Sequence, residues 1–373
     1  MARLEIIVGG TADTTGRRGR ALRAEERNGG VVRLAPGRFV DADAWRAANA
    51  AERHIARIKA LHDRLASRLV VSHASAAALH GLPWPGEFPE VIDVLDPERA
   101  TPQSLRGVHK RAGAGRSIAT KTMTATGRQL TDLVVTGVDL AITQPLRTSV
   151  PALDVVLARG VTRSALETEL AERGPVHGRH RAERAIELAD GRSGSPGESV
   201  ARVALDEVGA PVPVLQQRFD DGQGHIGTVD FWFPEQRAVL EFDGRVKYSD
   251  PSMRRAGQTA ADVVVAEKRR EDRLRRHTVV DAVGRIGFAE TNDTEALRAV
   301  LRAIGVPSRV RRFTRLRSPG ADRIRTTEST PHRRSQWCEV LSVVRTRSGR
   351  SATRARAARG RTRSSGRRGR SSR

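Results

Sequence analysis

The most regular pattern of apolar and polar positions lies between residues 195 and 244. Its first segment, residues 195–209, has a good N-cap residue in Ser195, a proline at the next position and a glycine at its end, which together predict a helix. The apolar residues that share one helical face are Val200, Val203, Ala204 and Val208. We therefore expect an amphipathic helix that packs through this face.

Three short runs of strand-forming residues follow this helix. They cover residues 212–219, 228–233 and 238–244, and the segments between them, residues 220–227 and 234–237, are rich in turn formers. The pattern predicts three consecutive antiparallel strands.

A basic helix is predicted after the three strands, at residues 261–277. In this segment Lys268 lies four positions before Asp272 and three before Glu271, which is the spacing of helix-stabilising ion pairs. Helix, three strands and helix form a compact αβββα unit. A basic helix beside an acidic sheet edge would supply cations that neutralise a phosphate group.

The rest of the chain predicts further helices and strands. Residues 20–45 predict a helix followed by a hairpin around Pro36 and Gly37, which is how winged-helix modules end. Residues 44–82 predict helix. The other expected elements are strands at residues 90–96 and 133–143, helices around residues 152–160 and 164–173, and a helix that leads into a glycine- and serine-rich connection near residue 193.

Three carboxylates interrupt the strands of the αβββα unit. Glu241 and Asp243 project from the same side of the third strand because strand side chains alternate, and Asp230 lies on the neighbouring strand within cross-strand reach. Unpaired, these acids would repel one another and lose hydration. A divalent cation, Mg²⁺ or Mn²⁺, would remove the conflict, since Mg²⁺ binds carboxylates, keeps several waters and accepts phosphate oxygens. The sequence therefore predicts a metal site.

Residues 195–276 resemble the PD-(D/E)XK nuclease superfamily, specifically its very-short-patch-repair-like endonuclease domains of unknown function. The matching stretches are "SPGES", "GTVDFWFPEQRAVLEFDGRVKY" and "EKRREDRLRRH". Two further stretches, "NGGVVRLAPGRFV" and "SHASAAALHGLPW", resemble AbiEi-type antitoxins with an N-terminal winged helix. The resemblance implies a restriction-endonuclease-like fold whose last core strand lies in residues 278–293.

The resemblance also implies roles for individual residues. Asp230 and Glu241 would bind the metal ion, and Glu198 would be a helix acid that faces the site. The lysine that the superfamily places two residues after the second acid is replaced here by Asp243. That lysine orients the attacking water, so catalysis requires another cation.

Lys247 and Lys268 are the candidates for this missing lysine, and Lys268 is slightly favoured. Two of the acids also have a structural interpretation. Glu198 has the spacing of a capping box with Ser195, and Asp243 precedes Gly244 and can start a turn. Both interpretations stay open at the level of the sequence.

Charge is concentrated at the end of the chain. The formal net charge is +23, but residues 301–373 hold 22 arginines, no lysine and 3 acids, so the first 300 residues carry only +4. An arginine-rich arm would bind phosphate backbones without sequence preference. Alternatively, the segment is a poorly selected extension. The charge alone is therefore no argument for nucleic acid.

Cysteine and histidine usage argues against a zinc site. Cys338 is the single cysteine, as expected in a reducing compartment, and His73 and His80 have no acid or cysteine near them in sequence. We expect both histidines to be structural. The apolar run at the start is too short for a secretory signal, and no stretch is long enough to span a membrane. A cytoplasmic protein is expected.

Four parts are therefore expected in an α/β (α+β) chain. They are a winged-helix-like module in residues 1–70, a middle region of helices and strands in residues 71–192, an αβββα restriction-endonuclease-like domain in residues 193–306, and a disordered arginine-rich tail in residues 307–373.

Two functions follow from this organisation. The leading hypothesis is a metal-dependent nuclease that hydrolyses DNA phosphodiester bonds. The alternative is a DNA-binding regulator of the antitoxin type, in which the nuclease-like domain is catalytically inactive. Both have DNA as the partner, and both leave open a toxin partner and the oligomeric state. A third possibility is a genomic relic with a spurious tail.

Overall fold

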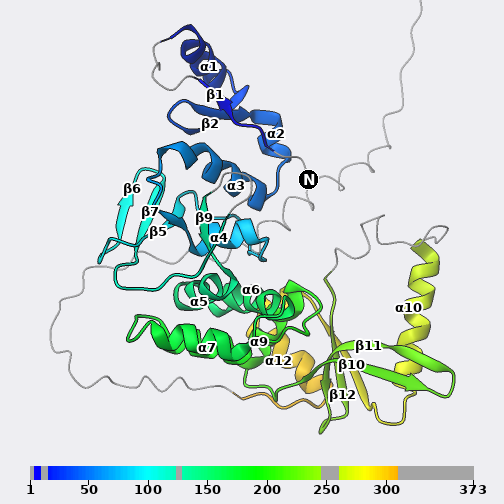
Figure 1. Ribbon diagram of the computed structural model, residues 1–373. Helices are drawn as coiled ribbons and strands as arrows, with labels where there is room; N and C mark the ends of the chain where they lie inside the picture. The colour runs from blue at the N-terminus through cyan, green and yellow to red at the C-terminus, as the bar shows by residue number, and fades with distance from the viewer. Residues whose placement is uncertain (1–3, 10–15, 123–127, 245–259, 310–373) are drawn as a thin grey trace, which may run out of the picture. The chain divides into compact units, whose positions relative to one another are not determined.

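The computed structural model describes residues 4–9, 16–122, 128–244 and 260–309 (Figure 1). Along these ranges, helices combine with one antiparallel and two mixed sheets in an α/β fold. No helix within them is long and apolar enough to cross a membrane. Apart from residues 307–309, the arginine-rich tail lies outside the described residues, and so does Cys338.

The first unit of the fold is a helix followed by a hairpin, as predicted for residues 20–45. Its elements are β1 (Ile7–Val8), α1 (Arg17–Arg27), β2 (Val31–Ala35) and β3 (Arg38–Asp41). Gly37 has φ +67° in the tight turn between β2 and β3, a conformation that glycine adopts without strain. Leu22 of α1 packs on Val31 and Phe39 of the hairpin. The unpredicted strand β1 completes the sheet in the order β1-β3-β2.

A six-stranded sheet and a helical layer make up the middle of the chain. The strands are β4 (Val70–Val71), β5 (Ile92–Asp96), β6 (Gln103–Leu105), β7 (Val108–Ala112), β8 (Thr120–Thr122) and β9 (Gln129–Thr131), in the order β6-β7-β5-β4-β9-β8. The helices are α2 (Ala42–Ala47), α3 (Ala50–Leu61), the 3-10 helix η1 (His62–Arg64), α4 (His73–His80), α5 (Leu133–Thr143), α6 (Leu146–Ala158), α7 (Arg163–Glu172) and α8 (Arg179–Leu188). The strand expected at residues 90–96 is confirmed as β5.

The strand predicted at residues 133–143 is wrong, because this segment is helix α5. Asp132 caps the helix by accepting a hydrogen bond from Val135 N. The helix is buried on nearly every side, so its sequence lacks polar residues at a helical spacing. Its β-branched residues favour a strand. Gly137 allows close packing, since a Cβ there would lie 3.1 Å from Leu153. Tertiary packing has overridden the local β propensity.

The segment predicted to be helical, residues 44–82, contains α2, α3, η1 and α4, but also a short strand that was not predicted. The C-cap of α2 is Ala48, and Asn49 starts α3 through a reciprocal capping box with Glu52. Val70 and Val71 then form the short strand β4, which pairs with β5. The last part of the prediction holds, since α4 ends at Gly81 with φ +63°.

Arginine side chains cap the C-terminal ends of several helices. Arg128 donates to His62 O at 2.9 Å and to Leu65 O at 3.1 Å, and Arg163 donates to the Ile186 and Ala189 carbonyls at the end of α8. Such contacts satisfy carbonyls that have no partner within the helix and favour the helix dipole. Part of the chain's positive charge is therefore structural.

His54 of α3 is completely buried and neutral. Its Nδ1–H donates to Pro89 O at 3.0 Å, and Nε2 accepts from Ser75 Oγ at 2.9 Å. The ring also stacks on Phe88 with centroids 5.1 Å apart. Burial lowers the pKa of His54 from 6.5 to about 4.

Stability should fall as the pH drops from about 6.5 to about 4, since in this window the unfolded chain binds a proton that folded His54 does not. The lowered pKa of His54 contributes about 3 kcal/mol to the difference in unfolding free energy between the two ends of this pH range. We expect the wild-type curve of unfolding free energy against pH to be steeper here than that of His54→Gln, which serves as the control because it titrates one group fewer. Parallel curves would show that His54 does not carry this dependence.

The last unit contains the helix, strands and helix predicted for residues 195–276. Its elements are α9 (Pro196–Glu207), β10 (Val214–Asp221), β11 (Gly224–Phe233), β12 (Ala238–Phe242), α10 (Ala260–Arg275), β13 (Ala282–Ile286), α11 (Phe288–Asn292) and α12 (Thr294–Ala303). The first strand begins and ends two residues later than predicted and the second begins four residues earlier, so only Gly222 and Gln223 separate them. The expected last strand is present as β13 and runs parallel to β12.

Helices cover both faces of this four-stranded sheet, whose order is β10-β11-β12-β13 (Figure 1). On one face, α9 and α12 pack against Phe231, Leu240 and Phe242. On the other face, Leu274 of α10 packs with Val239 of β12. The predicted alternation along β12 is therefore confirmed, with Leu240 and Phe242 on one side and Val239 on the other.

Candidate functional site

Asp230 lies where β11 and β12 stop pairing. Their pairing ends at Phe231 opposite Leu240, and the next pair in register would be Asp230 opposite Glu241. Here the carboxylate of Asp230 takes part in the backbone contacts, since Oδ2 accepts from Phe242 N at 2.8 Å. Asp230 thus bridges to β12 at the position where the strands separate.

Glu198 is connected to Asp230 through Gln216 of β10. Gln216 Nε2 donates to Glu198 Oε2 at 2.8 Å and to Asp230 Oδ1 at 3.3 Å. Glu198 also accepts from Gly194 N and from Ser195 Oγ, both at 2.8 Å. These contacts match the capping interpretation of Glu198, and Gln216 adds a link to the sheet.

The close approach of α9 to the sheet brings Glu198 into this position. Gly197 lies directly over Phe242, because a Cβ at this position would be 2.2 Å from the phenyl ring. Any larger residue would push the start of α9 away from β12. The glycine next to Glu198 therefore has a packing role that the sequence did not reveal.

Glu241 is held by two arginines from different elements. Arg270 of α10 donates to Oε1 at 2.7 Å, and Arg285 of β13 lies 3.5 Å from Oε2. Arg285 is the neighbour of Glu241 in the parallel β12–β13 register and also pairs with Glu271 at 3.1 Å. The carboxylate of Glu241 is mostly buried, so these guanidinium groups balance its charge.

The other predicted site residues do not join this set of contacts. Asp243 follows the end of β12 and is half-buried, and its N–H donates to Ile286 O at 2.7 Å. Lys268 is exposed and makes no hydrogen bond or ion pair with the described residues. Lys247 lies outside the described residues. The cation of α10 that reaches Glu241 is therefore Arg270, not Lys268.

The donor chemistry of these acids suits Mg²⁺, and their carboxylate oxygens accept hydrogen bonds from groups of the chain. Within residues 4–9, 16–122, 128–244 and 260–309, no three His, Cys, Asp or Glu residues are arranged to hold a metal ion. The oxygens of Glu198, Asp230 and Glu241 are instead engaged by amide, hydroxyl and guanidinium groups. The predicted repulsion among the acids is thus relieved by donors of the chain itself.

Gln216, Arg270 and Arg285 are the residues that sequence analysis missed. Arg270 could have been found, because it lies four residues before Leu274 and so shares the helix face that packs on the sheet, whereas Lys268 does not. Gln216 could not, since its φ of +52° breaks the strand alternation. Arg285 depends on the register of a parallel strand that is distant in sequence.

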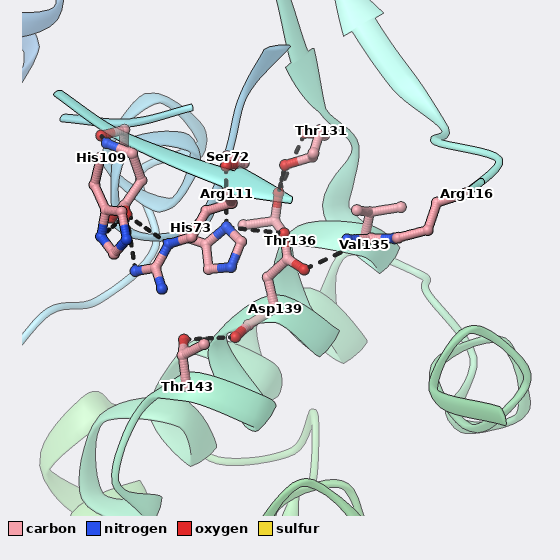
Figure 2. Close-up of polar contacts among 12 residues, drawn as sticks. Ser72, His73, His109, Arg111, Arg116, Thr131, Val135, Thr136, Asp139 and Thr143 are labelled. Atoms are coloured by element: carbon pink, nitrogen blue, oxygen red, sulfur yellow. Dashed lines mark hydrogen bonds and ion pairs between the residues drawn. The ribbon is translucent and has the colours of Figure 1, made fainter. Parts of the chain in front are cut away.

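A second buried polar cluster lies between α4, α5 and α7. Figure 2 shows His73 at the start of α4 with Nδ1 3.0 Å from Ser72 Oγ, and the same nitrogen is 3.3 Å from Asp139 Oδ2. Arg173 donates to the other oxygen of Asp139 at 2.9 Å. Burial lowers the pKa of His73, and its φ is +51°. The expectation that His73 is structural fits these contacts.

This cluster does not have the geometry of a nucleophilic triad. In such a triad the two ring nitrogens of the histidine contact the hydroxyl and the carboxylate separately, but here Ser72 and Asp139 approach the same nitrogen. His80 is also structural, since its Nε2–H donates to Thr131 O at 2.8 Å. His225, near the start of β11, is exposed.

The surface of α1 offers a different kind of site. Arg17, Arg20 and Arg27 are exposed and share one side of the helix by their spacing of three and seven residues, opposite the buried Leu22. The first turn of α1 contains no acid. Arg33 of β2 is exposed as well. Cationic side chains are therefore concentrated on the helix that precedes the hairpin.

Comparisons with known proteins bring few functional facts. No protein-family model matches the chain. The chain is 28% identical over 276 residues to the uncharacterized proteins MT2308 and Rv2248 of Mycobacterium tuberculosis, strains CDC 1551 and H37Rv, and the match covers 69% of this chain and 95% of each relative. A crystal structure of the RV2827C protein from Mycobacterium tuberculosis has a TM-score of 0.30 and 16% identity, covering 56% of this chain and 78% of that one.

Proposed function

We propose that this protein is a DNA-binding regulator whose nuclease-like part, residues 193–306, does not hydrolyse DNA. The observation that carries the proposal is the row of exposed arginines on α1, directly before the β2–β3 hairpin. A helix followed by a hairpin is the arrangement with which winged helices contact a duplex. Arg17, Arg20 and Arg27 would contact phosphates, and sequence preference would come from other side chains of the same helix and hairpin.

The charge balance around the acids supports the non-catalytic half of the proposal. Glu241 is paired with Arg270 and Arg285, and the position of the catalytic lysine holds Asp243. A divalent cation beside Glu241 would have to displace one guanidinium and tolerate the other. Both steps are unfavourable, since like charges a few ångströms apart repel by several kcal/mol at low dielectric.

Binding to a labelled duplex tests the proposal. The full chain should bind DNA from the region upstream of its own gene more tightly than a scrambled duplex of equal length, and the logarithm of its affinity should fall linearly with the logarithm of salt concentration. Fluorescence anisotropy measures both. Equal affinity for the two duplexes would exclude a sequence-selective regulator, and affinity independent of salt would exclude the phosphate contacts.

Metal-dependent hydrolysis of DNA is the second candidate. It is favoured by one specific observation: Glu198 and Asp230 bind the same amide group of Gln216, while Glu241 follows on the adjacent strand. Three acids of the type that binds Mg²⁺ thus come from neighbouring elements. In this case Gln216 and Arg270 would have to release the acids before a cation could bind.

A further inference from the structure

We infer that Arg270 and Arg285 take the place of a divalent cation beside Glu241, so that this sheet keeps its charge balance without a metal ion. The two arginines contact different oxygens of the carboxylate, at 2.7 Å and 3.5 Å. One comes from the helix that covers the sheet and the other from the neighbouring strand. The inference rests on the proposed non-catalytic role of residues 193–306.

Four charged side chains beside this sheet form a series of ion pairs in which the sign of the charge alternates. Arg270 pairs with Glu241, Glu241 with Arg285, and Arg285 with Glu271, which follows Arg270 on α10. The set has no net charge, and each acid has at least one guanidinium partner. A divalent cation would add two positive charges next to both arginines, and water could screen this repulsion only weakly because Glu241 is mostly buried.

The backbone provides room for Arg270. Gly227 of β11 lies beneath its side chain, because a Cβ at this position would be 3.0 Å from Arg270 Cδ and 3.1 Å from Nη1. Leu274, one turn later, is buried against the same sheet and fixes the face that α10 turns toward it. The side chain of Arg270 is therefore packed between α10 and β11.

Mn²⁺ binding to the full chain without DNA tests the inference. The double variant Arg270→Ala/Arg285→Ala should bind Mn²⁺ at least about tenfold more tightly than the wild type, because the two repelling charges are gone. Electron paramagnetic resonance of free Mn²⁺ gives the affinity directly. The control Arg269→Ala/Arg276→Ala removes the same charge from exposed positions, one in α10 and one directly after it, and should leave the Mn²⁺ affinity at the wild-type value.

Two results would overturn the inference. Wild-type protein that binds Mn²⁺ as tightly as the double variant would show that the arginines do not exclude the ion. Absence of binding by the folded double variant would show that this is not the place of a cation. Circular dichroism checks the fold, and Arg270→Gln/Arg285→Gln, which retains hydrogen-bonding side chains, replaces the alanine variant if that one is unfolded. DNA is absent, so a failure of DNA binding does not affect the result.

Discussion

Replacing Asp154 with alanine is expected to lower the free energy of unfolding by about 3–5 kcal/mol, which corresponds to a decrease in Tm of roughly 10 °C. Asp154 of α6 is paired with Arg202 of α9, and the two side chains are only 4% and 7% exposed. Asp154 also accepts a hydrogen bond from Asp190 N at 2.7 Å. Its removal leaves a buried guanidinium and a backbone N–H without their acceptor. Thermal and urea unfolding measure the loss.

Two further variants separate the buried pair from general effects of charge removal. Asp190→Ala removes an acid whose partner, Arg192, is mostly exposed, so the expected loss is about 1 kcal/mol or less. Asp154→Leu/Arg202→Leu removes both charges together and should recover part of the stability lost in Asp154→Ala. A single Asp154→Ala variant as stable as the Asp190→Ala control would contradict this account of how α9 is held.

Replacing Arg17, Arg20 and Arg27 with alanine is expected to weaken DNA binding at least about tenfold and to reduce the salt dependence by about three units of slope. These arginines lie on the exposed side of α1, so the fold should persist. If each contacts one phosphate, each contributes close to one released counterion. Fluorescence anisotropy at several salt concentrations gives both quantities.

A charge-matched variant provides the control for this measurement. Arg106→Ala/Arg298→Ala/Arg302→Ala removes three positive charges from the β6–β7 turn and from α12, which are not part of α1 or the hairpin. It should retain the wild-type slope of log affinity against log salt concentration. Its affinity for DNA should fall only slightly, because long-range electrostatic attraction is reduced. If the two triple variants weaken binding equally, only net charge matters and α1 is not the DNA-contacting helix.

Local sequence patterns were sufficient to predict the secondary structure of most of residues 195–286. The N-cap at Ser195, the turn residues between the strands and the alternation along residues 238–242 each specify one local structure, and all agree with one another. The failures are the strand β4, which was not predicted within residues 44–82, and residues 133–143, which form a helix and not the predicted strand. Helix α5 is buried almost all round, so apolar residues occupy positions that would be polar on a surface helix, and the segment resembles a buried strand.

The acids could be located from sequence, but their partners could not. Unpaired carboxylates in an apolar sheet require compensation, and that argument holds for Asp230 and Glu241. The source of compensation depends on three features that the local sequence does not show: the positive φ of Gln216, the packed face of α10 and the parallel register that places Arg285 beside Glu241. A cation was the simplest hypothesis, because side chains from distant segments are not visible in the local sequence.

Incubation of supercoiled plasmid with the full chain and Mg²⁺ tests the central claim most directly. Gel electrophoresis of each sample before removal of the protein shows binding, and electrophoresis after removal shows cleavage. The account predicts plasmid that is retarded by the wild type and returns fully supercoiled once the protein is removed. Nicked or linear plasmid that forms with the wild type, and is absent with Glu241→Ala, would contradict it and establish metal-dependent hydrolysis.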